Sequence, residues 1–185
     1  MNAAQQGTPA DVTKFAYAKL APRLSLGVRP RRPTALRLMA DLALIVNDPT
    51  REWSRAEPAS PAELETLRRA VPARVPDIYL QFLALSDGGE GPLGAEPGWF
   101  QIWPSSTVLD RNDGYGVFEA LPGFFGFGSN GGGELLAFEL SSPEAPVFMV
   151  PFIPLEATEA VLVAPSFLAF VSLLGISLPA SEGGA

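Results

Sequence analysis

Glu134 and Glu139 are the residues whose type and spacing come closest to a catalytic pair in this sequence. Glycosidases hold two carboxyl groups on either side of a sugar bond, about 5–10 Å apart. The two glutamates are separated by an odd number of positions in a segment that we predict to be a strand, and an odd separation places side chains on opposite faces. We therefore expect no shared catalytic site, and we expect Glu139 to be a solvated residue at a strand end.

The glycine-rich stretch 126–133 has the composition of a phosphate-binding loop. Such loops continue into a lysine and a hydroxyl residue, whereas Glu134 follows the glycines here and would repel a phosphate. The step Asn130-Gly131 is instead a strong turn signal, because both residues tolerate positive φ. We predict a β-hairpin over residues 122–140 in the middle of a sheet. Its candidates for the buried face are Phe125, Phe127, Leu136 and Phe138.

Asp110, Asn112 and Asp113 are oxygen ligands with the spacing of a loop that could hold a cation. A calcium loop of the EF-hand type continues into a glycine and then a glutamate, and no such sequel follows here. We expect residues 110–115 to be an ordinary polar loop. We expect neither a metal ion nor a cofactor.

The chain contains no cysteine and no histidine. The missing thiol excludes disulfides, thiolate metal sites and a cysteine nucleophile. The missing imidazole excludes histidine metal sites, Ser-His-Asp triads and the commonest general base. We infer a protein that is not an enzyme, and a carboxylate-based enzyme stays open as the least favoured alternative.

Aromatic side chains concentrate around one loop, at Trp99, Phe100, Trp103 and Tyr115. Most of these rings are expected in the core. One or two rings that stay exposed beside acidic residues would instead form a hot spot for protein binding.

Charge is divided unevenly along the chain. Residues 1–38 carry seven basic residues against Asp11 alone, a net charge of +6, so that the remainder carries −13 within the total of −7. An acidic domain repels nucleic acid and attracts basic partners. The basic run 29–33 is open to two interpretations, a solvated linker or a patch for nucleic acid or a membrane surface. We favour the linker, because prolines interrupt the run.

The composition changes at Met39, where an apolar run compatible with a helix begins. We interpret 1–38 as a basic extension that is disordered or dispensable, 39–178 as one domain, and 179–185 as a flexible tail. The uncharged stretch 160–178 is long enough to suggest a membrane span, but Pro165 and Ser166 divide it into a strand-like and a helix-like half. We therefore expect a cytoplasmic protein that does not bind membranes.

Capping and turn residues predict the remaining elements. Ser60, Pro61 and Glu63 form a capping box that begins a helix, and a second helix runs from about residue 74 to Ser86, where Gly88 and Gly89 would cap it. Residues 88–98 are expected to be a loop, 99–103 a strand, and 104–109 a turn or short helix. Strands at 147–152 and 160–163 precede a C-terminal helix over 165–174. This order of elements is typical of a small α+β domain.

These motifs, taken in order, resemble the SUKH superfamily, which includes cell-wall assembly regulators of yeast and many bacterial immunity proteins. The resemblance covers about residues 40–175. Its segments are 76–83 (PDIYLQFL), 86–89 (SDGG), 99–103 (WFQIW), 126–134 (GFGSNGGGE), 137–139 (AFE), 146–152 and 164–167. Asp87 stands where the family commonly has asparagine, a change that keeps the capping geometry.

The resemblance implies an α+β fold: a curved, mixed, largely antiparallel β-sheet with N-terminal helices and a C-terminal helix packed on it. It also implies a non-catalytic protein, most often an immunity protein that binds and neutralises a cognate toxin such as a nuclease. Its acidic surface suits a basic toxin. The alternative is a regulatory or scaffolding interaction module of the cell-wall regulator type. The sequence does not fix the oligomeric state.

The family's motif residues are expected to shape turns rather than to touch the partner. They are Gly88, Gly89, Trp103, Gly128, Asn130, Gly131, Gly132 and Glu134. Contact residues vary within such a family, so we predict them from type and expected exposure. The candidates for protein binding are Glu90, Glu96, Trp99, Asp110, Asp113 and Tyr115.

Overall fold

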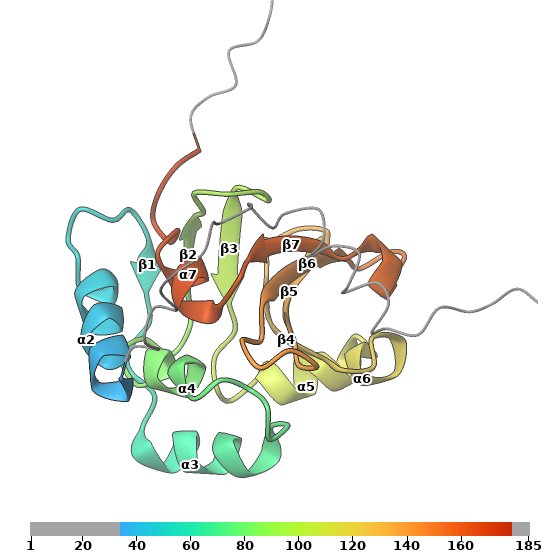
Figure 1. Ribbon diagram of the computed structural model, residues 1–185, viewed down its shortest axis with the longest axis horizontal. Helices are drawn as coiled ribbons and strands as arrows, with labels where there is room; N and C mark the ends of the chain where they lie inside the picture. Colours follow the sequence, from blue (N-terminus) through green and yellow to red (C-terminus); the bar gives the residue numbers. More distant parts are fainter. Residues whose placement is uncertain (1–33, 179–185) are drawn as a thin grey trace, which may run out of the picture.

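A single seven-stranded sheet organises the structure, a computed structural model that describes residues 34–178 (Figure 1). Each strand pairs antiparallel with the next strand of the chain, in the order β1 to β7. The strands are β1 (Ser54–Arg55), β2 (Gly89–Pro92), β3 (Trp99–Ile102), β4 (Phe124–Ser129), β5 (Glu134–Glu139), β6 (Val147–Pro151) and β7 (Val161–Ala164). The sheet is therefore antiparallel throughout the described residues rather than mixed.

Short helices surround this sheet. Those of the N-terminal half are α2 (Ala35–Val46), α3 (Pro61–Ala70) and α4 (Asp77–Leu83). The later ones are α5 (Val108–Gly114), α6 (Val117–Ala120), the 3₁₀ turn η1 (Ala157–Glu159) and α7 (Phe167–Val171). The predicted α+β fold with N-terminal helices and a C-terminal helix is confirmed. None of the helices within residues 34–178 is long and apolar enough to cross a membrane.

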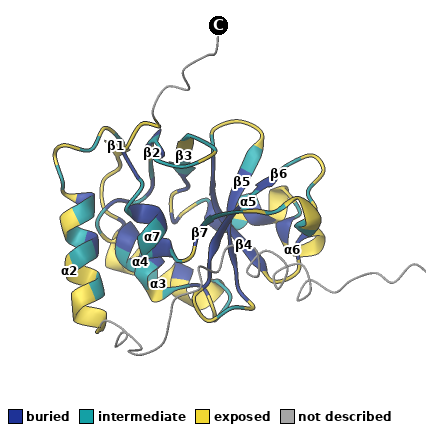
Figure 2. Ribbon diagram, turned by 45° about the horizontal axis from the view of Figure 1, so that its top comes forward, coloured by how far each residue is buried: buried dark blue, intermediate teal, exposed yellow. Residues whose placement is uncertain are grey.

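The predicted hairpin is the central pair of strands, β4 and β5. Phe125 lies opposite Phe138, and a register shift between Gly126 and Gly128 marks a bulge in β4. The predicted buried residues of the hairpin are all fully buried, namely Phe125, Phe127, Leu136 and Phe138. Figure 2 shows these central strands as the most buried part of the fold, with helices on both sides.

Aromatic rings fill the space between the hairpin and helices α4 and α7. Tyr79 of α4 and Phe167 of α7 make an edge-on pair with ring centroids 5.6 Å apart. Phe127 of β4 stacks on Phe138 of β5 at 4.5 Å and contacts Phe170 at 5.4 Å. We call these rings, Tyr79, Phe127, Phe138, Phe167 and Phe170, the aromatic core. Because ring pairs of this geometry add to the energy of apolar burial, the cluster fixes both helices on the hairpin.

The capping prediction for α3 is confirmed. The Ser60 hydroxyl accepts from the Glu63 amide and the Glu63 carboxylate accepts from the Ser60 amide, with Pro61 at the first helical position. Ser166 similarly caps α7 by accepting from the Ala169 amide. The strands expected at 99–103, 147–152 and 160–163 are present within one residue of their predicted limits.

Two expected loops are wrong. The stretch 88–98 contains strand β2, whose Gly-Glu-Gly-Pro sequence has little strand propensity but is held by pairing with β1 and β3. Residues 110–114 of the stretch 110–115 belong to helix α5, which begins at Val108, and Tyr115 is its C-cap. In both cases tertiary contacts override a local composition that is typical of loops.

Two further expectations are wrong at single residues. Helix α4 ends at Leu83 with Ala84 as its cap, so Gly88 and Gly89 do not cap it. They have φ of +97° and +140°, a geometry that favours glycine, and Gly89 begins β2 instead. Glu139 is buried rather than solvated, at 3% exposure, and its carboxylate accepts from the Ser141 amide at 2.7 Å.

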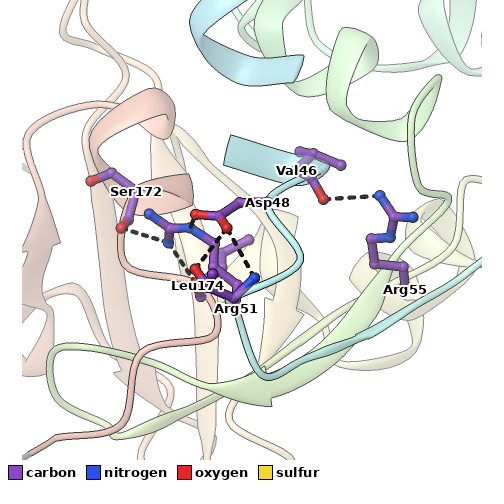
Figure 3. A network of polar contacts seen from close by, with 7 residues as sticks. Val46, Asp48, Arg51, Arg55, Ser172 and Leu174 are labelled. Carbon is purple, nitrogen blue, oxygen red and sulfur yellow. Dashed lines mark hydrogen bonds and ion pairs between the residues drawn. The ribbon is translucent and has the colours of Figure 1, made fainter. Parts of the chain in front are cut away.

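Arginine side chains join the segment after α2 to the rest of the chain (Figure 3). The Arg51 guanidinium donates to the carbonyls of Ser172 and Leu174 at 2.9 and 2.6 Å, beyond the end of α7. Its Nε lies 3.6 Å from the Asp48 carboxylate. Arg55 donates to the Val46 carbonyl at 2.9 Å. These contacts fasten the C-terminal end of the fold to the entry into β1.

Replacing Arg51 with alanine is expected to lower the free energy of unfolding by about 2–3 kcal/mol, because two charge-assisted hydrogen bonds to carbonyls are lost from a side chain that is only 16% exposed. Arg69→Ala is the matched control: it removes an exposed pair with Glu65 one helical turn away, worth about 0.5 kcal/mol or less. Urea unfolding of both variants measures the difference, and equal losses of unfolding free energy would contradict a stabilising role of the Arg51 hydrogen bonds.

Helix α2 begins at Ala35, and Thr34 caps it by accepting from the Arg37 amide. The apolar run from Met39 is therefore helical, as expected. The predicted boundary at residue 39 and the dispensability of 1–38 stay predictions. The basic run 29–33 and the whole C-terminal tail 179–185 lie outside the described residues.

Candidate functional site

Trp103, which directly follows β3, is the centre of an aromatic stack that joins three elements. It is 1% exposed and stacks on Tyr115 at the end of α5, with ring centroids 5.9 Å apart. Tyr115 in turn contacts Phe152 at the end of β6, at 4.5 Å. Arg111 of α5 places its guanidinium 5.2 Å from the centre of the Trp103 ring, within cation–π range.

A groove with a volume of about 370 Å³ lies beside this stack, between β2, β3 and α5. The residues of its walls that matter here are Glu90, Gln101, Trp103, Pro104 and Arg111. Glu90 and Gln101 lie opposite each other on β2 and β3, and the Gln101 amide donates to the Glu90 carboxylate at 3.0 Å. We call this feature the β2–β3 groove.

Trp99 extends this surface towards the β4–β5 turn. It is two positions from Gln101 in β3 and thus points to the same face of the sheet, and it is 43% exposed. A Cβ atom on Gly131 would lie 3.6 Å from the Trp99 ring, so the turn abuts this ring. The turn also contacts the other end of the surface, because the Phe152 amide donates to the Gly133 carbonyl at 2.8 Å.

Asn112 holds helix α5, which carries Arg111 and precedes Tyr115, against the sheet. It is fully buried, and its amide nitrogen donates to the carbonyls of Val108 and Gly126, each at 2.7 Å. Its amide oxygen accepts from the Gly126 amide at 2.8 Å. Glycine at position 126 leaves room for this contact, because a Cβ atom there would lie only 3.2 Å from the Asn112 amide oxygen. The position of the aromatic stack therefore depends on Asn112.

Asp87 holds the segment that follows Trp103. Its two carboxylate oxygens accept from the amide and the hydroxyl of Ser105, at 2.7 and 3.0 Å. A carboxylate can accept both of these hydrogen bonds at once, whereas an asparagine side chain offers only one acceptor oxygen. Asp87 thereby fixes the segment that joins Trp103 to α5.

The structure brings three of the six predicted binding residues to this surface. Glu90 lines the groove, and Trp99 and Tyr115 stand beside it with exposures of 43% and 46%. Glu96 is exposed in the loop between β2 and β3 and does not line the groove. Asp110 faces a different pocket between α3 and α5, and Asp113 is exposed near the end of α5. The role of all six residues in binding stays a prediction.

Arg111 is the groove residue that the sequence did not reveal. It falls in the stretch expected to be a loop, where its direction is undefined. In a helix, Arg111 and Tyr115 are four positions apart and share one face. This spacing beside Trp103 was the available signal, and it becomes meaningful only once α5 is known to be helical.

The alternative chemistries find no support in the geometry. Glu134 pairs with the side chain of Asn130 in the β4–β5 turn, while Glu139 is buried at the other end of β5. The glycine-rich stretch forms this turn, in which the Asn130 side chain accepts from the amides of Gly132 and Glu134. Among residues 34–178, no three acidic side chains gather as they would around a metal ion.

Ionisable groups with shifted pKa values lie outside the groove. Burial, followed by the charge of Asp87, raises the pKa of Tyr79, whose hydroxyl has no hydrogen-bond partner among the described residues. Hydrogen bonds from Thr50 lower the pKa of Asp48, and those from Ser60 lower the pKa of Glu63. The hydrogen bonds at Asp48 and Glu63 shape local turns and caps, so these shifts do not mark an acid–base centre.

A family model for the SMI1/KNR4 family (SUKH-1) matches residues 58–173, well over half of the chain. The chain belongs to the SMI1/KNR4 (SUKH-1) family. The resemblance that the motifs suggested is thus confirmed, and the SUKH-1 match includes β2 to β7 and every residue of the groove named above. The family includes immunity proteins, and its domains are generally non-catalytic. No curated protein matches the chain.

The SUKH-1 motif glycines allow neighbouring strands to approach each other. A Cβ atom on Gly88 would lie 2.6 Å from the Ile102 carbonyl oxygen, and one on Gly128 would lie 2.5 Å from that of Gln101. Both distances are too short for a side chain to fit without movement of the backbone. These residues therefore shape the sheet beneath the groove, and Gly131 sits against the Trp99 ring.

Proposed function

We propose that this SUKH-1 chain is a non-catalytic protein-binding domain that acts as an immunity protein and blocks a cognate toxin by occluding it. The observation that carries this proposal is the surface around the β2–β3 groove. It presents two exposed aromatic rings, Trp99 of β3 and Tyr115 at the end of α5, beside the Glu90 carboxylate of β2. Rigid aromatic side chains with polar neighbours are the residues that dominate the energy of protein interfaces.

The charge of the domain indicates the kind of partner. Residues 34–178 carry seven basic and eighteen acidic residues, a net charge of −11. This charge attracts a basic protein over a distance and accelerates its association. Toxins that act on nucleic acid are commonly basic, because they must bind phosphates. We therefore propose a basic, nucleic-acid-acting toxin as the partner and the cytoplasm as the place of action.

The test is expression of a toxin candidate from a neighbouring gene in a bacterial host, with and without the protein. Rescue of growth together with co-purification of the two chains is the expected result. Chains beginning at residues 1, 34 and 39 should rescue equally, because the proposal treats 1–38 as dispensable. Failure of well-folded, well-expressed protein to rescue or co-purify would overturn the immunity role and favour a regulatory or scaffolding module.

Trp99→Ala is expected to weaken toxin binding about 10- to 100-fold, because truncation of a central aromatic hot spot removes about 1.4–2.8 kcal/mol. Phe118→Ala is the matched control, since Phe118 has nearly the same exposure, 42%, but lies on α6 away from the groove. Isothermal titration calorimetry with the purified toxin measures both. Equal effects, or an effect only at Phe118, would place the interface elsewhere.

A further inference from the structure

Arg111 differs from every other arginine within residues 34–178. Each of the other side chains has an acceptor or an acidic partner. Arg37, Arg51, Arg68 and Arg69 pair with carboxylates, and Arg55 and Arg74 donate to carbonyls. The Arg111 guanidinium lies over the face of the Trp103 ring and has no hydrogen-bond acceptor or acidic partner among the described residues. Its guanidinium thus lines the groove with its donors unused.

Trp103 supplies a second unused donor at the same place. The residue is 1% exposed and lines the groove, yet its indole Nε1–H has no hydrogen-bond partner among residues 34–178. Buried polar groups are rarely left unpaired, because each lost hydrogen bond is unfavourable. The Trp103 ring thus carries the Arg111 guanidinium on its face and an indole N–H at its edge, and both donors lack an acceptor among the described residues.

We propose that Arg111 and Trp103 receive a carboxylate from an Asp or Glu side chain of the bound protein. The planar guanidinium fork matches the two oxygens of a carboxylate, and this pairing is stronger than one between neutral groups. The Nε1–H lies at the edge of the same ring, in the ring plane, and becomes the second donor of the site once the side chains that bury it move. The inference rests on the proposed function, since the carboxylate belongs to the protein that this domain binds.

Glu90 on the facing wall favours this carboxylate over a phosphate. A phosphate carries up to two charges and three strong acceptor oxygens, so Glu90 and Asp87 in the same groove would repel it more strongly. Glu90 uses one oxygen to accept from Gln101, and its carboxylate is otherwise exposed. It can take a lysine or arginine next to the partner's acidic residue. A basic partner with one acidic residue at the contact therefore suits both Arg111 and Glu90.

Titration of the ¹⁵N-labelled full chain with sodium acetate tests the site without any knowledge of the partner. The protein has three tryptophans, and Trp103→Phe assigns the indole signal of Trp103. The expected result is a saturable downfield shift of this signal at constant ionic strength, with little change at Trp53 and Trp99. Arg111→Ala should weaken the binding at least tenfold, whereas Arg69→Ala, on the exposed face of α3, should leave it unchanged.

Three results would overturn the inference: no saturable shift, the same shift with sodium chloride alone, or tighter binding of inorganic phosphate than of acetate. A second arm uses Arg111→Glu in the co-expression test, where it should abolish rescue. If Arg111→Glu still rescues while Trp99→Ala does not, the carboxylate site is wrong and the immunity role stands. If the unaltered protein itself fails to rescue but the acetate shift is present, the immunity role fails and the site stands.

Discussion

Asn112→Ala is expected to lower the free energy of unfolding by about 3–5 kcal/mol. The substitution removes three hydrogen bonds at full burial and leaves the amide and the carbonyl of Gly126 without this partner. Each buried group that loses its partner accounts for about 1–3 kcal/mol. Losses of this size are rare for single residues and arise from broken buried networks.

Asn112→Asp separates the two hydrogen bonds that the amide nitrogen donates from the one that the amide oxygen accepts. Aspartate keeps an oxygen that can accept from the Gly126 amide but presents an acceptor to two carbonyl oxygens, so it should destabilise at least as much as alanine. Asn47→Ala is the control, because Asn47 is exposed and its loss should amount to about 1 kcal/mol or less. Urea unfolding measures all three variants, and similar losses at residues 47 and 112 would contradict the assigned role.

Phe127→Ala is expected to lower the free energy of unfolding by about 3–5 kcal/mol, because it opens a cavity in the aromatic core. Phe127 is fully buried and contacts rings of β5, α4 and α7, so the space cannot close without moving several elements. Phe118→Ala, on an exposed ring, should cost about 1 kcal/mol or less. Thermal and urea unfolding compare the two. A loss below that of Phe118→Ala would mean that the hairpin is not held by these rings.

Local signals in the sequence were sufficient where one residue type decides the structure. The Asn130-Gly131 turn and its flanking aromatic runs predicted the central hairpin, because positive φ and alternation leave few other structures. The Ser60–Glu63 capping box predicted the start of α3, because each side chain satisfies a backbone amide of the other residue. These features depend on residues that are close together in the sequence, so the sequence alone is enough to predict them.

The features that were missed depend on neighbours in space. Strand β2 contains two glycines and a proline, and only its pairing with β3 makes it a strand. Helix α5 is polar on most of its surface, and Asn112 is held there by the distant Gly126. Glu139 is buried because the chain turns back over it to Pro146, whose carbonyl accepts from the Glu139 amide. No short-range pattern reports such pairings.

The candidate surface could be predicted only in part for the same reason. Exposed aromatic candidates such as Trp99 and Tyr115 followed from residue type, and both lie beside the groove. The buried centre of the aromatic stack, Trp103, was expected as a motif residue. Arg111 became visible only when α5 placed it over the Trp103 ring. Glu96, Asp110 and Asp113 were chosen for charge alone, and the fold places them outside the groove.

The central claim is that this SUKH-1 domain binds and blocks a toxin through the surface around the β2–β3 groove. Its most direct test is titration calorimetry of the purified protein with a purified toxin candidate from a neighbouring gene, together with an assay of the toxin's activity. We expect a saturable complex that inhibits the toxin and is weakened about 10- to 100-fold by Trp99→Ala but not by Phe118→Ala. A folded protein that neither binds nor inhibits this toxin would contradict the claim.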